Sequence, residues 1–259
     1  MTTIFLAILA HVIADFPLQT SGMATKKSNL KISGYLVHGL VVLGTQLILL
    51  QGYQLQAMLP FSLVIFVTHI IIDFLKNILC RLGKGVADLA GFLIDQGLHL
   101  AVIISAWPMF QWEPNTAVRT FYQSLLPAKA IMVFQQSHLT KGGPALDHIL
   151  AGAIIYILVC FGGAVLVRKI LNVLDDKEDS LKSQQKVGAA IGLMERLIII
   201  TLALCGSLGS IAFILTAKSI ARFNELNDRR FAEYYLVGTL TSTAIAICGG
   251  IFLKYFITL

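Results

Sequence analysis

Long apolar stretches are the feature that most constrains the fold of this chain. Several of them reach the roughly 20 consecutive residues that an α-helix needs to cross the hydrocarbon core of a bilayer. Only 13% of the residues are charged and the mean hydropathy is +0.78, whereas a typical soluble domain has about 25% charged residues. These features predict an all-α, polytopic transmembrane helical bundle of about seven spans. The expected helices cover approximately residues 2–18, 31–51, 58–80, 86–106, 145–168, 188–217 and 232–256.

The first apolar run begins almost at Met1 and has neither a basic n-region nor an A-x-A cleavage pattern. It is therefore expected to be a retained helix and not a cleaved signal peptide. The four cysteines lie singly in or beside apolar runs, where they are typical of small hydrophobic residues. They form neither a disulfide framework nor a CxxC metal motif.

Basic residues gather after the first, third and fifth expected helices, so the positive-inside rule predicts that these loops are cytoplasmic and the N-terminus is outside. The basic residues behind the net charge of +6 are then expected to set the orientation in the membrane and to contact lipid headgroups. The sequence shows no surface of interleaved aromatic and basic residues, so nucleic-acid binding is not predicted. One group conflicts with this topology, because it follows the sixth helix on the predicted outer side. A re-entrant piece, or a further crossing within 107–144, would reverse the last two helices. The conflicting residues are Lys218, Arg222, Arg229 and Arg230.

The chain is expected to divide into three parts. Residues 1–106 hold four helices with tight connections. Residues 107–144 contain four prolines and a Gly-Gly pair, and are predicted to form an external loop with an interfacial amphipathic helix near 117–136. Residues 145–259 hold the three remaining helices around a polar cytoplasmic loop.

A polar motif recurs inside two of the apolar runs. His11-x-x-x-Asp15-Phe16 in the first helix returns as His69-x-x-x-Asp73-Phe74 in the third. Each is followed by a helix with a further histidine, His38 in the second and His99 in the fourth. This pattern favours a duplicated helical hairpin, with the two copies related by an axis along the membrane normal.

Residues four apart lie on one face of a helix, so His11 with Asp15, His69 with Asp73 and Asp95 with His99 each form a pair of neighbouring side chains. All seven polar residues, including His38, fall at similar depth in the predicted cytoplasmic half, where they can meet. Unpartnered charges there are costly, and a divalent metal is the simplest partner. Zinc is the first expectation and manganese the second. Seven ligands suit two ions, or one ion with carboxylates that orient the histidines. A proton or ion pathway and a purely structural polar cluster are the alternatives.

Other polar residues are predicted to lie near this cluster and to bind substrate. Gln96 neighbours Asp95, Lys76 lies one turn after Asp73, and Gln19 follows the first helix. In the sixth helix, Glu195 and Arg196 lie at matching depth, and Arg196 is a candidate phosphate clamp, with an ion pair as the alternative. Lys76 is equally explained by ordinary positive-inside snorkelling.

The opening HVIADFPLQT, His38, HIIIDF and DQGLH resemble an uncharacterised family of bacterial inner-membrane proteins that begin H-x-x-A-D-F-x-L-Q. The resemblance covers about the first hundred residues and implies a location in the inner membrane, but no activity. MERLIII, AKSIARF and EYYLVGTL resemble the longer members. The site is also similar in kind to membrane-bound metal-dependent hydrolases, including zinc amidases of the ceramidase type, although the chain lacks their HExxH and HxxxH motifs.

The first hypothesis for function is an intramembrane metal-dependent hydrolase. It would act from the cytoplasmic side on a lipid or lipid-linked substrate, including a phosphorylated one, with Asp95 as general base. The rival is a cation- or proton-coupled transporter that uses the same cluster, and a third reading is a membrane scaffold with a structural metal. Unbroken apolar runs around the His-Asp pairs count against the transporter, since transporter sites are typically built from interrupted helices.

Overall fold

The computed structural model describes residues 1–80, 85–125, 144–174 and 185–258. Most of these residues are helical, and the only β-contact among them is an isolated bridge between Tyr53 and Pro114. The chain forms two compact units, which are described separately. Unit 1 contains residues 1–83 and 90–154, and unit 2 contains residues 84–89 and 155–259.

Within the described residues, five helices are long and apolar enough to cross a membrane. These candidate spans are Ile32–Leu50, Leu55–Leu79, Val86–Met109, Leu146–Leu174 and Arg229–Thr258. Two further apolar helices, Thr2–Asp15 and Leu208–Ala221, are shorter. The transmembrane helical class is thus supported, whereas the predicted number of about seven spans is not confirmed.

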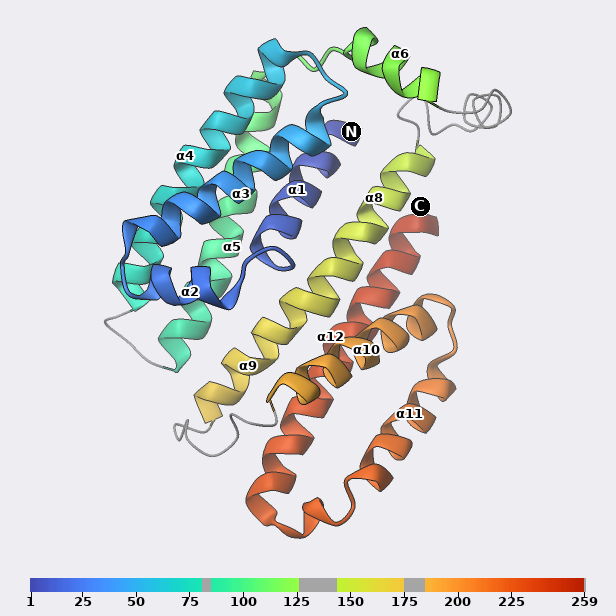
Figure 1. Cartoon of the computed structure of the whole chain (residues 1–259). Coiled ribbons are helices and arrows are strands. Elements are labelled where there is room, and N and C mark those ends of the chain that lie inside the picture. The colour runs from blue at the N-terminus through green and yellow to red at the C-terminus, as the bar shows by residue number, and fades with distance from the viewer. Residues whose placement is uncertain (81–84, 126–143, 175–184, 259) are drawn as a thin grey trace. The chain divides into compact units, whose positions relative to one another are not determined.

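Unit 1 is built mainly from the first five helices (Figure 1). α3 packs against α1 and α4, and the short α2 packs against the ends of α3 and α4. An amphipathic helix, α6, and most of α8 complete the unit. Their bounds are α1 Thr2–Asp15, α2 Ser21–Ser28, α3 Ile32–Leu50, α4 Leu55–Cys80, α5 Val86–Ala106, α6 Thr116–Leu125 and α8 Pro144–Ile157.

The first helix ends earlier than the predicted residue 18, and a helix follows it that was not predicted. Pro17 disfavours helical geometry at the residue before it and lacks an N–H, so α1 stops at Asp15. The Thr20 hydroxyl accepts a hydrogen bond from Met23 N at 3.3 Å and caps α2. α6 covers the first part of the predicted interfacial helix 117–136, and the rest of it lies outside the described residues.

The apolar core of unit 1 occupies one half of the bundle. Phe61, Ile65 and Ile103 are buried there with Val42 and Leu50, and Trp107, Phe110 and Trp112 pack against them. In a membrane-spanning bundle such contacts stabilise the helix arrangement through van der Waals packing, because the lipid around the helices is as apolar as these side chains. The other half of the same bundle holds the polar cluster, so the apolar half supplies the rigid frame for it.

Unit 2 contains α9 (Gly163–Leu174), preceded by the π-helical turn η3 (Leu158–Gly162), and the helices α10 (Gln185–Leu204), α11 (Leu208–Ala221) and α12 (Arg229–Thr258). α12 runs antiparallel to η3 and α9. A Cβ on Gly238 would lie 3.4 Å from Leu171, and a Cβ on Gly249 would lie 2.5 Å from Val159. Residue numbers therefore rise along α12 as they fall along the preceding helix.

The predicted single helix 188–217 is wrong, because the chain turns back at Gly206, which has a φ of +77°. A left-handed backbone conformation of this kind ends a helix and costs glycine nothing sterically. α10 and α12 run parallel: Arg196 bonds to Ser242, and a Cβ on Gly250 would lie 2.6 Å from Ala203. α11 connects α10 to α12 along the chain and runs in the opposite direction to both (Figure 1).

This hairpin corrects the predicted placement of the late basic residues. Lys218 Nζ lies 2.6 Å from Glu195 Oε2, which fixes α11 antiparallel to α10. Lys218 and the residues after it therefore lie toward the end of unit 2 that holds Leu174 and Gln185, and not at the opposite end. Within unit 2, α12 is therefore antiparallel to α9, whereas a single helix over 188–217 would have made these two helices parallel.

Candidate metal centre

Seven polar side chains converge in unit 1, all buried and none more than 8% exposed. They come from four helices. α1, α4 and α5 each contribute a histidine and an aspartate one turn apart, so both side chains of a pair point the same way. α3 contributes one histidine. The seven are His11, Asp15, His38, His69, Asp73, Asp95 and His99.

Asp15 lies among all four histidines. Its Oδ1 is 3.3 Å from His38 Nε2 and 3.4 Å from His69 Nε2. Its Oδ2 is 3.8 Å from His11 Nε2 and 4.0 Å from His99 Nδ1. The carboxylate of the first helix is thus the common neighbour of imidazoles from every helix of the cluster.

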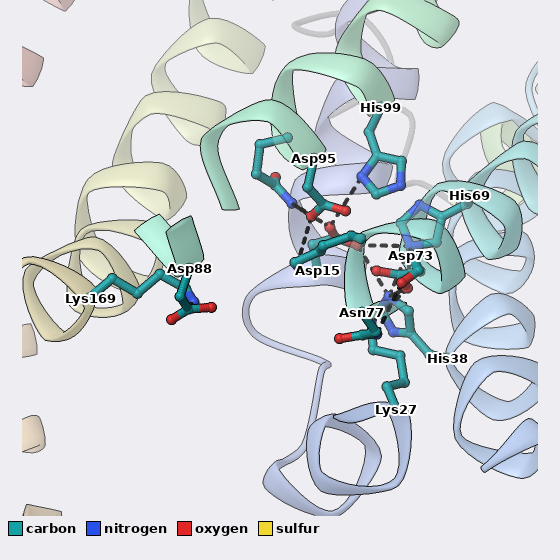
Figure 2. Close-up of polar contacts among 12 residues, drawn as sticks. Asp15, Lys27, His38, His69, Asp73, Asn77, Asp88, Asp95, His99 and Lys169 are labelled. Atoms are coloured by element: carbon teal, nitrogen blue, oxygen red, sulfur yellow. Dashed lines mark hydrogen bonds and ion pairs between the residues drawn. The ribbon is translucent and has the colours of Figure 1, made fainter. Parts of the chain in front are cut away.

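The imidazoles also contact one another. His38 Nε2 and His69 Nε2 are 2.9 Å apart, a hydrogen bond that requires one ring to be protonated there and the other not (Figure 2). The rings of His69 and His99 stack with centroids 4.0 Å apart at 12°. Stacked rings this close disfavour a charge on both, so neutral imidazoles with free lone pairs are expected here.

Among the described residues, three overlapping groups of buried side chains could hold a metal ion, with the ligand atoms of each group within 4.8 Å of one another. The first group is His11, Asp15, His69 and His99, with donors from three helices. The second is His38, His69 and Asp73, and the third is Asp73, Asp95 and His99.

The donor atoms fit a cation because many of them have no other partner. In the described part of the chain, both ring nitrogens of His11 and of His99 are buried without a hydrogen bond. His69 Nδ1, Asp15 Oδ1 and Asp95 Oδ1 are in the same condition. Buried polar atoms in folded proteins are nearly always satisfied, since each unpaired group costs about 1–3 kcal/mol. Imidazole and carboxylate donors in this number suit a divalent metal ion.

Two lysines lie against the carboxylates. Lys27 Nζ is 2.7 Å from Asp73 Oδ2, and Lys76 Nζ is 2.9 Å from Asp95 Oδ2 (Figure 2 shows the Lys27 side chain beside Asp73). With neutral histidines, three carboxylates and two ammonium groups leave one formal negative charge, and that charge belongs to Asp15. One divalent ion would convert it into one formal positive charge.

Lys27 comes from α2 and was not predicted as a site residue. It is only 5% exposed. Its carbonyl oxygen accepts a 2.8 Å hydrogen bond from Tyr35, and Asn77 donates to the same Tyr35 hydroxyl at 3.0 Å. In the sequence, Lys27 was recognisable only as one of the basic residues that follow the first helix. Its burial follows from α2 folding back onto α3 and α4.

The substrate-binding residues predicted in the first half of the chain lie at the cluster. Gln96 Nε2 donates to Asp15 Oδ2 at 2.9 Å and contacts Asp95 Oδ2 at 3.3 Å. Gln19, with its amide oriented to satisfy both neighbours, donates to the Asp15 carbonyl at 2.8 Å and accepts from Lys27 Nζ at 2.9 Å. Lys76 pairs with Asp95, as above. Their role in binding substrate stays a prediction.

Glu195 and Arg196 belong to unit 2 and not to the unit that holds the cluster. Glu195 pairs with Lys218. Arg196, 4% exposed, donates to the Cys160 carbonyl through Nε at 3.1 Å and Nη2 at 2.8 Å, and Nη1 donates to Ser242 at 3.2 Å. Cys160 lies in the π-helical turn, where the altered hydrogen-bond ladder leaves a carbonyl for the guanidinium. Arg196 is thus fully engaged in joining three helices.

The predicted duplication requires the two His-x-x-x-Asp pairs to face each other across the bundle. The rings of His11 and His69 have centroids 5.5 Å apart, and Asp15 and Asp73 both contact His38 and His69. The two pairs therefore meet at one site, as any shared site requires. The rotational relation between the two hairpins stays a prediction.

Comparison with known proteins gives one finding. No curated protein and no solved structure matches the chain. A family model described as "Protein of unknown function (DUF3307)" matches residues 3–126, a segment that contains every member of the cluster. That description names no activity, so the likeness to metal-dependent hydrolases stays a prediction. Over these residues the chain is similar to an uncharacterised family, as its opening motifs indicated.

Proposed function

We propose that this chain is an intramembrane metal-dependent hydrolase whose divalent ion is held by His11, Asp15, His69 and His99. The observation that carries the proposal is the set of unpartnered nitrogens around Asp15: both in His11, both in His99 and Nδ1 in His69, among the described residues. Of the three candidate groups it is also the one without a lysine on its carboxylate. Zinc is the preferred ion and manganese the second.

A bound divalent ion supplies Lewis acidity, which makes a water molecule acidic near neutral pH and polarises an ester carbonyl or phosphoryl group. The protein supplies the rest. Asp95 Oδ1 is buried without a hydrogen bond, and it would act as general base by accepting a proton from the attacking water molecule. Lys76 donates a hydrogen bond to the other oxygen of Asp95, and Gln96 ties Asp95 to Asp15.

The charge of the site indicates the substrate class. With both lysines and one divalent ion counted, the buried site carries one formal positive charge, which favours a monoanionic reacting group such as a phosphodiester over a neutral amide. The candidate spans surround the site with apolar surface, which favours a lipid or lipid-linked substrate. By the positive-inside rule, the basic residues of α2 support a position of the site toward the cytoplasmic leaflet, and the resemblance of the opening motifs supports a bacterial inner membrane.

A cation- or proton-coupled transporter is the second candidate. What favours it is the single unbalanced charge on Asp15, which one proton on a neighbouring imidazole would neutralise, whereas a divalent ion would leave one positive charge. What weighs against it is that α1, α4 and α5 are continuous helices through His11, His69 and His99. Helices interrupted at the binding site are the usual way in which transporters expose one.

The decisive experiment measures metal content and hydrolysis on the detergent-purified protein. Wild type should retain zinc or manganese. His99→Ala should lose it, whereas His38→Ala, outside the proposed ligand set, should keep it with an affinity about 10–100-fold weaker, as for residues that orient ligands. The rate at which water-soluble phosphate or headgroup is released from phospholipid vesicles should rise and fall with the metal content of the protein. Folded, metal-free wild type would remove the proposal, and metal-dependent uptake of cations or protons into sealed vesicles without hydrolysis would favour the transporter.

A further inference from the structure

We infer that Lys27 and Lys76 are built-in cations that occupy the second and third cation positions of the cluster, so that the protein binds one divalent ion and not two. The inference rests on the proposed metal site and specifies its stoichiometry. Its basis is that each candidate group other than His11, Asp15, His69 and His99 contains an aspartate that already holds a lysine.

The second position is that of His38, His69 and Asp73. Lys27 Nζ lies 2.7 Å from Asp73 Oδ2, and this same oxygen is 3.8 Å from His38 Nε2 and 3.5 Å from His69 Nε2. The Lys27 ammonium group therefore already pairs with the Asp73 oxygen that lies nearest to both imidazoles. A zinc ion would have to lie about 2.0–2.2 Å from a carboxylate oxygen.

A metal and an ammonium on one carboxylate group repel each other. Two unit charges about 4 Å apart near a protein surface repel each other enough to weaken binding roughly 10³-fold. A divalent ion doubles this repulsion energy, which squares the factor. A second ion therefore binds only if Lys27 leaves. Lys27 is poorly placed to leave, because its side chain is 6% exposed.

The position of Lys27 is fixed by the way α2 packs. Tyr35 in α3 donates a hydrogen bond to the Lys27 carbonyl, and Gln19 accepts one from Lys27 Nζ. α2 approaches α3 so closely that a Cβ on Gly34 would lie 2.7 Å from Lys26 Cβ and 2.8 Å from Lys27 N. The packing of α2 against α3 thus holds the Lys27 ammonium group beside Asp73.

The third position, Asp73, Asp95 and His99, has two of its ligands held by lysines. Lys76 Nζ donates to Asp95 Oδ2 at 2.9 Å and lies 6.0 Å from the centre of the Phe92 ring. Its side chain is 22% exposed, more than that of Lys27. Of the two built-in cations, Lys76 is therefore the one that a substrate anion could reach, and Lys27 is the one that sets the metal count.

The experiment counts metal ions bound to purified full-length protein after equilibration with excess zinc and removal of free ion. Wild type should hold one equivalent. Lys27→Met removes the ammonium and keeps an apolar chain of similar length, and it should hold two. Lys26→Met is the matched control, since Lys26 is exposed on the same helix, and it should hold one. Lys27→Arg keeps the charge and should also hold one.

Manganese gives a second readout. Two Mn²⁺ ions a few ångströms apart produce a spin-coupled electron paramagnetic resonance signal, expected in Lys27→Met and absent in wild type. If Lys27→Met does not fold, Lys27→Gln, which retains a polar end, takes its place. The wild-type count decides on its own between one ion and two.

The outcomes separate this inference from the proposed function. One equivalent in wild type and one in a folded, charge-removing Lys27 variant would overturn the role of Lys27 and leave the metal site standing. Two equivalents in wild type would overturn the inference alone. No bound metal in folded wild type would overturn both.

Discussion

Replacing Gly39 with alanine tests how the packing of α3 on α4 controls the cluster. Gly39 follows His38 directly and contacts α4 beside His69. An added Cβ would lie 2.8 Å from Ile70 Cδ1, 2.9 Å from Ile70 Cγ1 and 2.9 Å from Phe66 Cε2. Unstrained carbon contacts lie at about 3.5–4.0 Å. Ile70 is β-branched with a stiff χ1, so the helices must separate by roughly 0.7–1 Å at this point.

The magnitude follows from that displacement. Overpacking of this kind costs about 1–3 kcal/mol, which corresponds to a fall of about 3–10 °C in the unfolding midpoint of a domain this size. The His38–His69 contact, now 2.9 Å between Nε2 atoms, would open beyond hydrogen-bonding distance. The proposed ligands come from α1, α4 and α5, so one metal equivalent should remain, bound about 10–100-fold more weakly.

The assay is thermal unfolding in detergent, paired with a metal titration of the same samples. Gly44→Ala is the control, because Gly44 lies on the same helix and a Cβ there meets nothing within 4 Å. It should leave the midpoint unchanged or raise it, since alanine exceeds glycine in helix propensity by up to about 1 kcal/mol. Equal midpoints for the two variants would refute the packing argument. Loss of all metal from folded Gly39→Ala would refute the assignment of ligands to α1, α4 and α5.

Gly206→Ala should lower the unfolding free energy of unit 2 by about 1–2 kcal/mol, because alanine is strained at a φ of +77°, whereas Gly209→Ala, in open space, should not; equal thermal midpoints would contradict this. Removing the metal with a strong chelator should destabilise unit 1 by about 2.7 kcal/mol relative to protein in metal at a hundredfold its dissociation constant, and a chelator-insensitive midpoint would speak against the site. In a cysteine-free background, cysteines placed at Leu174 and Asn227 should react with an impermeant thiol reagent from the same side of sealed vesicles. Labelling from opposite sides would contradict the α10–α11 hairpin.

Local spacing made the core of the cluster predictable from the sequence. A histidine and an aspartate four residues apart share a helix face whatever the tertiary fold, and similar depth in successive helices brings such faces together. That reasoning identified His11, Asp15, His69 and Asp73 without knowledge of the packing. It also identified Lys76 as a residue near the cluster, but not its pairing with Asp95 on the next helix.

Features that depend on the chain folding back were not predictable in this way. Lys27 reaches Asp73 because α2 folds against α3 and α4, and a basic residue in a loop carries no sign of such a contact. Gly206 sits in an apolar run with other glycines, and nothing in the run marks it as the one that adopts a positive φ. Arg196 was assigned to the cluster from depth alone, which does not determine to which unit a helix belongs.

The distribution of the ligands over successive helices also orders the events of membrane assembly. In a chain inserted as proposed here, α1 enters the bilayer with His11 and Asp15 while α3, α4 and α5 are still to be synthesised. A charged side chain carries an insertion cost of up to about 2.5–3.5 kcal/mol, the value at the centre of a span, and α1 must bear the smaller cost of Asp15 at its end without its later neighbours. Only the arrival of α5 brings Gln96 to Asp15 and the last imidazole, His99, to the cluster. Metal loading is then the closing step of biogenesis, and a nascent chain arrested before α5 presents Asp15 without Gln96 and His99 to the machinery that removes misassembled membrane proteins.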